Sequence, residues 1–334
     1  MAKLSYQGDR FALIGEETVL DGLLRRGHEV AHACRSGVCQ ACTLVCESGD
    51  LPSESQQGLR EVERSQGVFL ACQCRPKGDL ELIPLDGGAI VESAIVEIDR
   101  LSASVVRVRV EPESEVAYEA GQYLALQRAD GLTRSYSIAS VPSEPWLEFH
   151  IRRVPGGRMS TWFFDEARVG DRVGLRRPTG SCCYAAIEEP EAPLLLVGVG
   201  TGLAPLWGLV REALAAGHHG PICLIRAARS CAGLYLDEPL EALAAANPNQ
   251  LELRSCVLEG QAAEGVELGK VNELAAKIVE SSAAPGAWTA VVCGDPDVVK
   301  ALRFELFLSG VSSKRILADA FVMTRPPGES SNAA

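Results

Sequence analysis

The sequence predicts a multidomain protein in which three domains of different character follow one another. Six of its twelve cysteines lie within residues 34–74, a density that sets this first segment apart. Residues 104–110 and 146–154 alternate between apolar and polar side chains, which is typical of an antiparallel sheet or small barrel. From about residue 192, short apolar strands alternate with Ala/Leu-rich helical stretches, as in a parallel sheet flanked by helices.

We place the domains at residues 1–88, 89–190 and 191–334. The chain has 334 residues, which fits two or three domains at about 100–200 residues each. The first domain ends near a glycine pair, Gly87 and Gly88, that suits a linker. The last ten residues (RPPGESSNAA) are predicted to form a flexible tail, because their composition cannot bury apolar surface.

The overall composition excludes some classes of partner. Hydrophobic residues make up 47% of the chain and charged residues 23%, as in an ordinary protein with ample core. The net charge of −12 argues against a nucleic-acid partner, because phosphate binding needs a basic surface. We therefore expect no nucleic acid to be bound.

The sequence also favours a cytoplasmic location. The first residues lack the apolar core and cleavage site of a signal peptide. Residues 192–210 approach the length of a membrane span, but glycines and Pro205 interrupt them, and a buried strand, a glycine turn and a packed helix explain them better. In a reducing cytoplasm, a thiol cluster indicates metal binding or catalysis more than disulfides.

The cysteine spacing predicts an iron–sulfur cluster. Cys34, Cys39 and Cys42 form a C-x4-C-x2-C pattern, and Cys72 follows after a long spacer. This is the ligand spacing of plant-type [2Fe–2S] clusters, in which one loop supplies three thiolates and a separate segment the fourth. A zinc site is the alternative, but its usual pattern is two C-x2-C pairs or added histidines. The spacer and Gly37, which lets the backbone approach the cluster closely, favour iron and sulfur.

The spacing alone leaves the fourth ligand open. Cys74 stands two residues after Cys72, so both would share a face of an extended segment. Cys46 is expected to be a small buried hydrophobic residue, as most free cysteines are.

Two stretches in the second domain point to a phosphate-bearing planar cofactor. Arg134, Tyr136 and Ser137 stand at the end of a predicted strand, where a guanidinium suits a diphosphate and a tyrosine ring can pack on a heterocycle. About twenty residues later, Gly156 and Gly157 precede the start of a predicted helix. Free N–H groups and the helix dipole make such a start an anion site, although an ordinary capped helix would look similar.

The third domain carries two strand-end motifs. Residues 194–205 read as a strand, a G-x-G-T-G turn and a helix, and in open α/β sheets ligands bind at such carboxyl ends of strands. The turn departs from the dinucleotide fingerprint G-x-G-x-x-G, because Leu203 follows the third glycine. A second strand ends in Cys293, Gly294, Asp295 and Pro296 before a helix.

Taken in order, these motifs resemble the ferredoxin–NADP reductase superfamily, and in it the reductase components of bacterial multicomponent oxygenases. The resemblance covers nearly the whole chain. It implies an N-terminal β-grasp domain of the plant-type ferredoxin kind, an antiparallel β-barrel that binds FAD, and a C-terminal α/β domain that binds NAD(P)H. The implied cofactors are FAD, a [2Fe–2S] cluster and NADH or NADPH, with NADH favoured although Arg226 and Arg229 could meet a 2′-phosphate.

The resemblance also implies roles for individual residues. The cluster ligands would be Cys34, Cys39, Cys42 and Cys72. Ser137, Thr201 and Cys293 would lie at the reacting atoms of the flavin and nicotinamide. The cofactor-binding residues would be Arg134, Ser135, Tyr136, Ser137, Gly156, Gly157, Met159, Ser160, Thr161, Gly200, Thr201, Gly202, Cys293, Gly294 and Phe321. Gln40 stands where relatives have a small residue, so we expect it to alter hydrogen bonding to the cluster.

The expected function is that of an electron-transfer enzyme. A hydride would pass from NAD(P)H to FAD, and single electrons would then pass through the cluster to an oxygenase component, hydroxylase component or intermediate ferredoxin. The alternatives are a reductase for a non-oxygenase partner, such as a deoxysugar dehydrase, and a non-catalytic electron carrier. We expect a monomer without a membrane span.

Overall fold

The computed structural model describes residues 2–28, 30, 32, 35–37, 40, 42–59, 61–85, 90–187 and 189–321, with the backbone alone at residues 61 and 62. These residues fall into two compact units that divide near residue 88. The predicted ligands Cys34 and Cys39 and the predicted flexible tail lie outside the described residues.

The first unit is a small mixed sheet packed against a helix, as in the predicted β-grasp domain. Its strands lie in the order β2-β1-β5-β3-β4, with β1 and β5 parallel and the other pairs antiparallel. Helix α1 begins at a capping box of Thr18 and Asp21 and buries one face of its side chains in the core. The elements are β1 (Lys3–Tyr6), β2 (Asp9–Ala12), α1 (Val19–Arg25), β3 (Thr43–Ser48), α2 (Glu61–Ser65), β4 (Val68–Leu70) and β5 (Leu80–Pro84).

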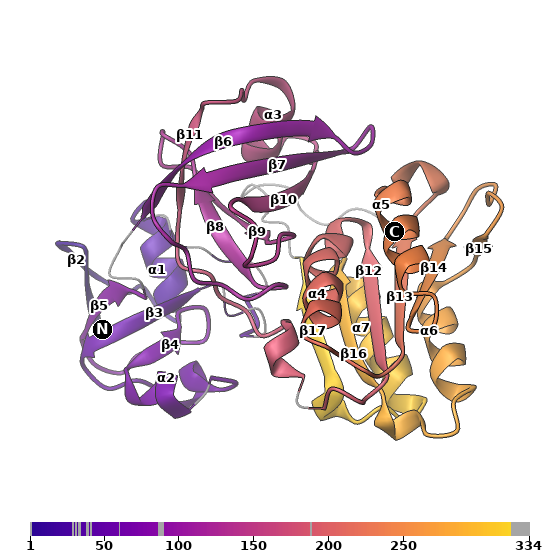
Figure 1. The fold of residues 1–334 in the computed structure, drawn as a ribbon. Coiled ribbons are helices and arrows are strands. Elements are labelled where there is room, and N and C mark those ends of the chain that lie inside the picture. Colours follow the sequence, from indigo (N-terminus) through magenta and orange to yellow (C-terminus); the bar gives the residue numbers. More distant parts are fainter. Residues whose placement is uncertain are drawn as a thin grey trace. The chain divides into compact units, whose positions relative to one another are not determined.

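The second unit begins with a six-stranded antiparallel sheet (Figure 1). The strand order is β10-β7-β6-β11-β8-β9, and a bridge between Ile138 and Phe149 joins the end of β9 to β10, so the sheet curls towards a barrel. Its core holds the predicted apolar faces, because Val106, Val108 and Val110 lie opposite residues 151, 149 and 147. The elements are β6 (Val91–Arg100), β7 (Val105–Pro112), β8 (Tyr123–Gln127), β9 (Thr133–Ser137), β10 (Leu147–Arg152), α3 (Arg158–Asp165) and β11 (Arg172–Leu175).

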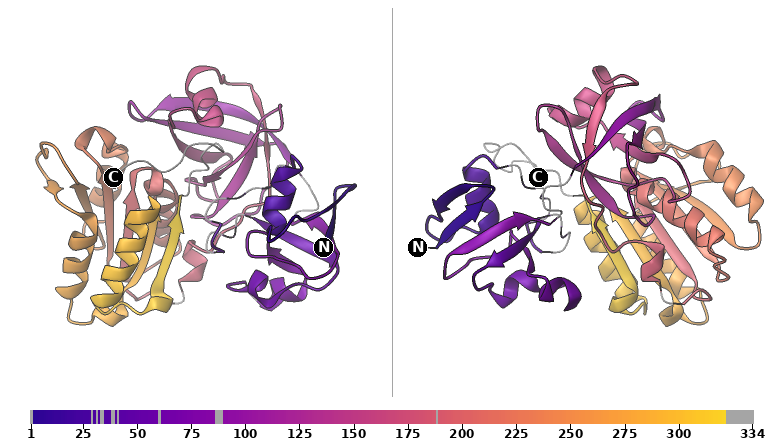
Figure 2. Two further views of the ribbon diagram at one scale, coloured as in Figure 1. Left: turned by 180° about the vertical axis from the view of Figure 1, so that it is seen from behind. Right: turned by 60° about the vertical axis from the view of Figure 1, so that its left-hand side comes forward.

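The chain continues into a parallel sheet with helices on both faces (Figures 1 and 2). The strand order is β15-β14-β13-β12-β16-β17, and every pairing is parallel. Helices α4 and α5 share a core with one face, and α6 and α7 share a core with the other. The elements are β12 (Leu194–Val199), α4 (Leu203–Ala215), β13 (Ile222–Ala228), α5 (Asp237–Ala246), β14 (Leu251–Val257), β15 (Val266–Leu268), α6 (Val271–Glu280), β16 (Thr289–Gly294), α7 (Pro296–Leu308) and β17 (Ile316–Ala320).

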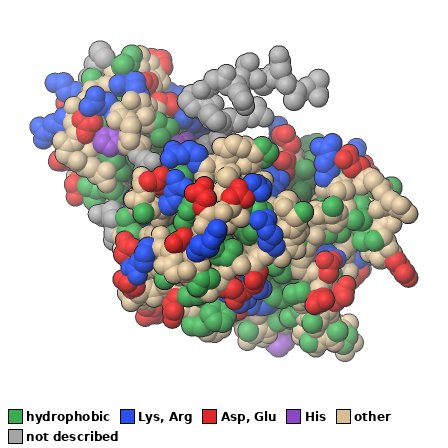
Figure 3. Space-filling view, turned by 90° about the horizontal axis from the view of Figure 1, so that it is seen from above, with side chains coloured by type: hydrophobic (Ala, Val, Ile, Leu, Met, Phe, Trp, Pro, Cys, Tyr) green, Lys and Arg blue, Asp and Glu red, His purple; other side chains and the backbone are tan. Residues whose placement is uncertain are grey.

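The apolar stretch of residues 192–210 forms β12, a short 3-10 turn and α4, as predicted. In the described part of the chain, every helix is too short or too polar to cross a bilayer. On the face drawn in Figure 3, basic and acidic side chains lie interspersed. In the second unit, Arg107 forms an ion pair with Glu97, and Arg172 forms one with Glu113.

One expectation for β10 is wrong. Its alternation predicts one buried and one polar face, but Glu148 and His150 on the polar face are only 2% and 5% exposed. The reason is a long-range contact: the ring of Tyr235, which precedes α5, meets the His150 ring edge-on, with 5.4 Å between centroids. Both faces of β10 are therefore covered, one of them by the part of the chain that carries the parallel sheet.

This contact belongs to a buried polar network. Glu148 accepts a hydrogen bond from Arg109 at 2.7 Å and lies 2.9 Å from His150 Nε2, while His150 Nδ1 lies 3.3 Å from the Tyr235 hydroxyl. Burial raises the pKa of Glu148, but the His150 and Arg109 contacts outweigh it and lower that pKa to about 2. Burial lowers the pKa of His150, against the opposing pull of Glu148. The carboxylate is thus charged in the folded protein at neutral pH.

We expect Glu148→Gln to lower the free energy of unfolding of the second unit by about 2–3 kcal/mol at neutral pH, because it removes the carboxylate that Arg109 and His150 share. Since the folded pKa is depressed, the contribution is present above the ordinary carboxyl pKa of 4.5 and is lost as the pH falls towards 2. Calorimetry should therefore show a gap between protein and variant that narrows below pH 4.5.

The control is Glu113→Gln, which removes an exposed carboxylate from Arg172, where both side chains are at least half exposed. Exposed pairs of this kind contribute little to stability. Equal losses in the two variants would contradict a special role for the buried carboxylate.

Candidate active site

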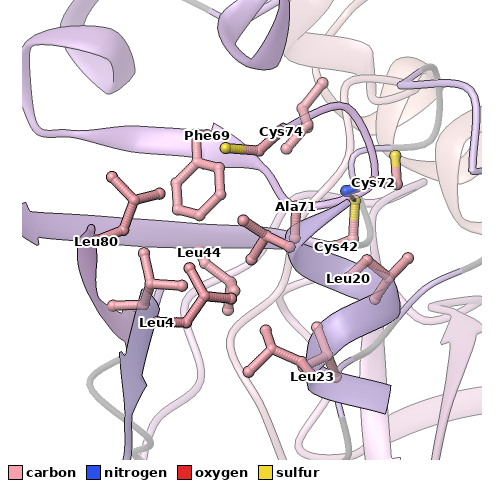
Figure 4. Packing of buried hydrophobic residues seen from close by; sticks show 14 of the residues in the cluster. Leu4, Leu20, Leu23, Cys42, Leu44, Phe69, Ala71, Cys72, Cys74 and Leu80 are labelled. Atoms are coloured by element: carbon pink, nitrogen blue, oxygen red, sulfur yellow. Dashed lines mark hydrogen bonds between the residues drawn. The ribbon is translucent and has the colours of Figure 1, made fainter. Parts of the chain in front are cut away.

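The sheet of the first unit brings two predicted cluster ligands together. Cys42 directly precedes β3 and Cys72 follows β4, and the pairing of Thr43 with Leu70 sets the two cysteines side by side (Figure 4). The backbone N–H of Cys72 lies 3.4 Å from the Cys42 sulfur. An N–H group directed at sulfur stabilises a thiolate. Cys42, from the loop, and Cys72, from the separate segment, are therefore suited to bind one cluster from its two sides.

The structure separates Cys72 from Cys74. Cys74 is fully buried beside Phe69, on the far side of the turn from Cys42 (Figure 4). Burial raises its pKa to about 12, against an opposing hydrogen bond with Ser55, so Cys74 is a protonated core thiol. Cys46, which the sequence predicts to be buried, is only partly buried; it packs against the same core, and burial raises its pKa as well. These positions support Cys72 as the fourth ligand.

The loop between Cys34 and Cys42 is described at only a few positions. Gln40 has a left-handed backbone, with φ of 54°, which explains why a small residue suits this position. Its side-chain amide donates to Gly58 O at 3.0 Å, so the Gln40 amide is engaged by the protein backbone. Among the described residues no group of three or more His, Cys, Asp or Glu could hold a metal ion, and two of the four predicted ligands lie outside them.

The predicted flavin residues lie on two elements of the antiparallel sheet domain. Arg134 and Ser135 are exposed on β9, whereas Tyr136 and Ser137 are half-buried there. The Tyr136 ring meets Phe163 of α3 edge-on, with 6.1 Å between centroids. Burial raises the pKa of Tyr136, so its hydroxyl stays protonated. This packing fixes the position of the Tyr136 ring. A fixed ring is suited to stack on a planar cofactor.

The start of α3 suits a diphosphate. Gly157 is the N-cap, and no side chain in the described part of the chain caps the helix, which leaves its first N–H groups for a ligand. Ser160 instead braces the turn before it, because its hydroxyl accepts from Val154 N and donates to Gly157 O. Met159 is buried, Thr161 is half-buried and Gly156 is exposed with φ of 70°. These residues fit the phosphate portion of FAD.

The predicted nicotinamide residues lie where two parallel strands end together. Gly200, Thr201 and Gly202 form a 3-10 turn between β12 and α4, and β16 pairs with β12 up to Cys293. A Cβ on Gly202 would overlap the carbonyl oxygen of Cys293. Gly294 has φ of 131°, and a Cβ there would overlap Val199 O. The glycines therefore allow a close backbone approach at the strand ends, where ligands bind in open α/β sheets.

Sequence reasoning missed the partner of Cys293. The Cys293 thiol is buried and interacts with Cys182, which lies between β11 and β12; this contact and burial raise the Cys293 pKa well above 9. The thiol is therefore neutral at physiological pH. No local pattern around Cys182 signals the contact, since the two residues are far apart in sequence. Phe321 is the last described residue, directly after β17, and its place beside the flavin stays a prediction.

Comparisons with known proteins agree with this order of sites. The model of the 2Fe-2S iron-sulfur cluster binding domain matches residues 7–77. The oxidoreductase FAD-binding domain matches residues 92–184, and the oxidoreductase NAD-binding domain matches residues 196–303.

Relatives that align with this chain along most of their length show the family to which it belongs. The reductase component of the naphthalene 1,2-dioxygenase system of Pseudomonas putida, a ferredoxin–NAD(P)(+) reductase, is 33% identical over 311 residues, covering 91% of this chain and 93% of the relative. The chain belongs to the reductase components of oxygenase systems. The electron transfer component of toluate 1,2-dioxygenase, also from Pseudomonas putida, is 31% identical to this reductase, with 91% and 92% of the two chains covered.

A solved structure extends the likeness to the fold of the reductase. The crystal structure of the Amycolatopsis reductase GcoB has a TM-score of 0.69 and 29% identity, and the match covers 96% of this chain and 99% of that one. The protein is thus an NAD(P)H-dependent iron–sulfur flavoprotein oxidoreductase, with FAD, NAD(P)H and a [2Fe–2S] cluster as its cofactors.

We expect Cys72→Ser to lose the visible absorbance of the cluster, because it removes a thiolate at the predicted ligand position. Cys74→Ser is the matched control, since the same substitution two residues away changes a thiol that packs beside Phe69 and not beside Cys42. It should keep the cluster spectrum, with some loss of thermal stability. Absorbance and electron paramagnetic resonance of the two purified variants measure this, and the reverse pattern would make Cys74 the ligand.

Proposed function

We propose that this reductase oxidises NADH and delivers electrons one at a time, through its cluster, to a separate oxygenase component or to an intermediate ferredoxin. The observation that supports this most is the order of three cofactor domains in a chain that aligns along most of its length with reductases of oxygenase systems. Bound flavin supplies the change from a two-electron donor to one-electron delivery.

The chain's own residues position and shield the cofactors in this proposal. Arg134 and the uncapped start of α3 bind the flavin diphosphate, while Tyr136, braced by Phe163, packs on the ring system. The Gly200–Gly202 turn admits the nicotinamide, and the backbone of Cys293 packs against that turn while its thiol stays buried and neutral. Ser137, at the end of β9, offers a hydroxyl to the flavin ring.

Reduction by NADH under anaerobic conditions tests the proposal. Stoichiometric NADH should first bleach the flavin absorbance and then reduce the cluster, which is followed by its electron paramagnetic resonance signal. Steady-state NADH oxidation with an artificial acceptor excludes a non-catalytic carrier, and reconstitution with candidate oxygenase components identifies the acceptor. A flavin that bleaches while the cluster stays oxidised would disprove the electron path. Light scattering of the purified protein tests the proposed monomer.

The ion pairs of two arginines at the end of β13 support the choice of NADH. Arg226, near the end of β13, is buried, donates to Ser255 Oγ at 2.8 Å and pairs with Asp237 at 2.6 Å. Arg229, just beyond β13, is exposed but pairs with Glu259 at 2.7 Å. In such folds a 2′-phosphate is met by an arginine after the second strand. Here Glu259 already pairs with Arg229, and its carboxylate would repel the phosphate.

We expect Glu259→Gln to strengthen binding of NADP⁺ by about two- to fivefold, the effect of one exposed charge pair, and to leave binding of NAD⁺ nearly unchanged. Isothermal titration with both nucleotides measures this. Glu252→Gln, which removes the exposed carboxylate that pairs with Arg254 at the other end of β14, is the control and should affect neither nucleotide. Unaltered NADP⁺ binding in Glu259→Gln would place the basis of cofactor choice elsewhere.

A further inference from the structure

Gln73 connects two segments around the predicted cluster. It follows Cys72 directly, and its side-chain amide nitrogen lies 3.4 Å from the Cys72 sulfur. The same nitrogen donates to Arg35 O at 2.9 Å and lies 3.1 Å from Cys72 O. One amide group therefore touches both the turn that carries the fourth ligand and the loop that carries the other three.

The opposite loop leaves room for this side chain. Gly37 has φ of 82°, and a Cβ built on it would lie 3.1 Å from Gln73 Cγ and 3.5 Å from Gln73 Cδ. A side chain at position 37 would crowd Gln73 as well as strain the loop. Gly37 therefore leaves space for the Gln73 side chain. It also gives the loop the backbone freedom that the sequence suggested.

We propose that Gln73 is a positioning residue that sets the reduction potential of the cluster through the amide N–H directed at the Cys72 sulfur. The inference rests on the proposed function, because it takes Cys72 as a ligand. Hydrogen bonds to ligand sulfurs tune cluster potentials. The reduced cluster carries one more negative charge than the oxidised one, so an N–H donor stabilises the reduced form and raises the potential.

The structure distinguishes Gln73 from the other glutamine near the cluster. The sequence singles out Gln40 as the residue that alters cluster hydrogen bonding, but its amide donates to Gly58 O. Gln40 and Gln73 therefore form a natural pair, with the same side chain in two loops, and among the described residues only Gln73 contacts a predicted ligand sulfur.

The consequence for electron transfer has a definite direction. An amide group does not titrate at physiological pH, so its effect on the potential is the same at every pH at which the protein works. By raising the potential of the cluster, Gln73 favours movement of electrons towards it and away from the flavin. When the protein is partly reduced, loss of the donor should therefore leave a larger share of the electrons on the flavin and a smaller share on the cluster.

The test is a redox titration of the fully loaded protein, followed by the electron paramagnetic resonance signal of the reduced cluster. Gln73→Leu removes the donor at similar volume and should lower the potential, so that the ratio of reduced to oxidised cluster falls about tenfold at a fixed potential, or about 59 mV for one electron. Gln73→Glu replaces the donor with a carboxylate and should lower the potential further. Gln40→Leu should leave it unchanged.

The outcomes separate this inference from the proposed function. Gln73→Leu and Gln73→Glu proteins that hold the cluster at the original potential overturn the inference, even when NADH still reduces them normally. A shift of equal size in Gln40→Leu also overturns it, because the effect would then come from general disturbance of the loops. If Gln73→Leu fails to assemble the cluster, Gln73→Asn, whose shorter side chain withdraws the amide from the sulfur without adding charge, decides the matter. Failure of NADH to reduce the cluster of the unaltered protein counts against the proposed function instead.

Discussion

The close approach of two strand ends governs the nucleotide half of this enzyme. Strands β12 and β16 are neighbours in the parallel sheet, and the turn after β12 lies against the backbone at the end of β16. Side chains at Gly202 or Gly294 would hold these segments apart. That contact sets the place of Cys293, the start of α4 and the surface that is predicted to receive the nicotinamide. A change of a single methyl group there would move several site residues at once.

The same helix, α4, ties this sheet to the flavin half. Arg211 donates to Ala139 O at 2.7 Å and pairs with Glu144, while Glu212 accepts from Ala120 N. Gly208 packs against the backbone of Ala139 and Ser140. The segment that follows the flavin strand β9 therefore rests on a helix whose first residues form part of the nucleotide turn. The elements that carry the predicted flavin and nucleotide residues therefore pack directly on one another.

Much of the architecture could be predicted from local patterns. Three local patterns depend on backbone geometry within a few residues: the Cys34–Cys42 spacing, the glycine turn and the period of the strands. The three kinds of domain that they predict are confirmed. What local patterns could not show depends on side chains that meet across long stretches of sequence. Glu148 and His150 look like one polar face of a strand until Tyr235 covers them. Cys72 and Cys74 look equivalent until the fold places Cys72 beside Cys42 and Cys74 beside Phe69.

The contact between His150 and Tyr235 also limits how freely the two cofactor halves can be exchanged between relatives. The rings come from opposite sides of the boundary between the FAD-binding match, which ends at residue 184, and the NAD-binding match, which begins at residue 196. The buried Glu148 contacts His150, and the buried Arg226 donates to the Tyr235 carbonyl. A chimera joined at that boundary would combine His150 from one parent with whichever residue the other parent has at the position of Tyr235. Modular exchange of the nucleotide half therefore requires that the two rings be transferred together as a matched pair.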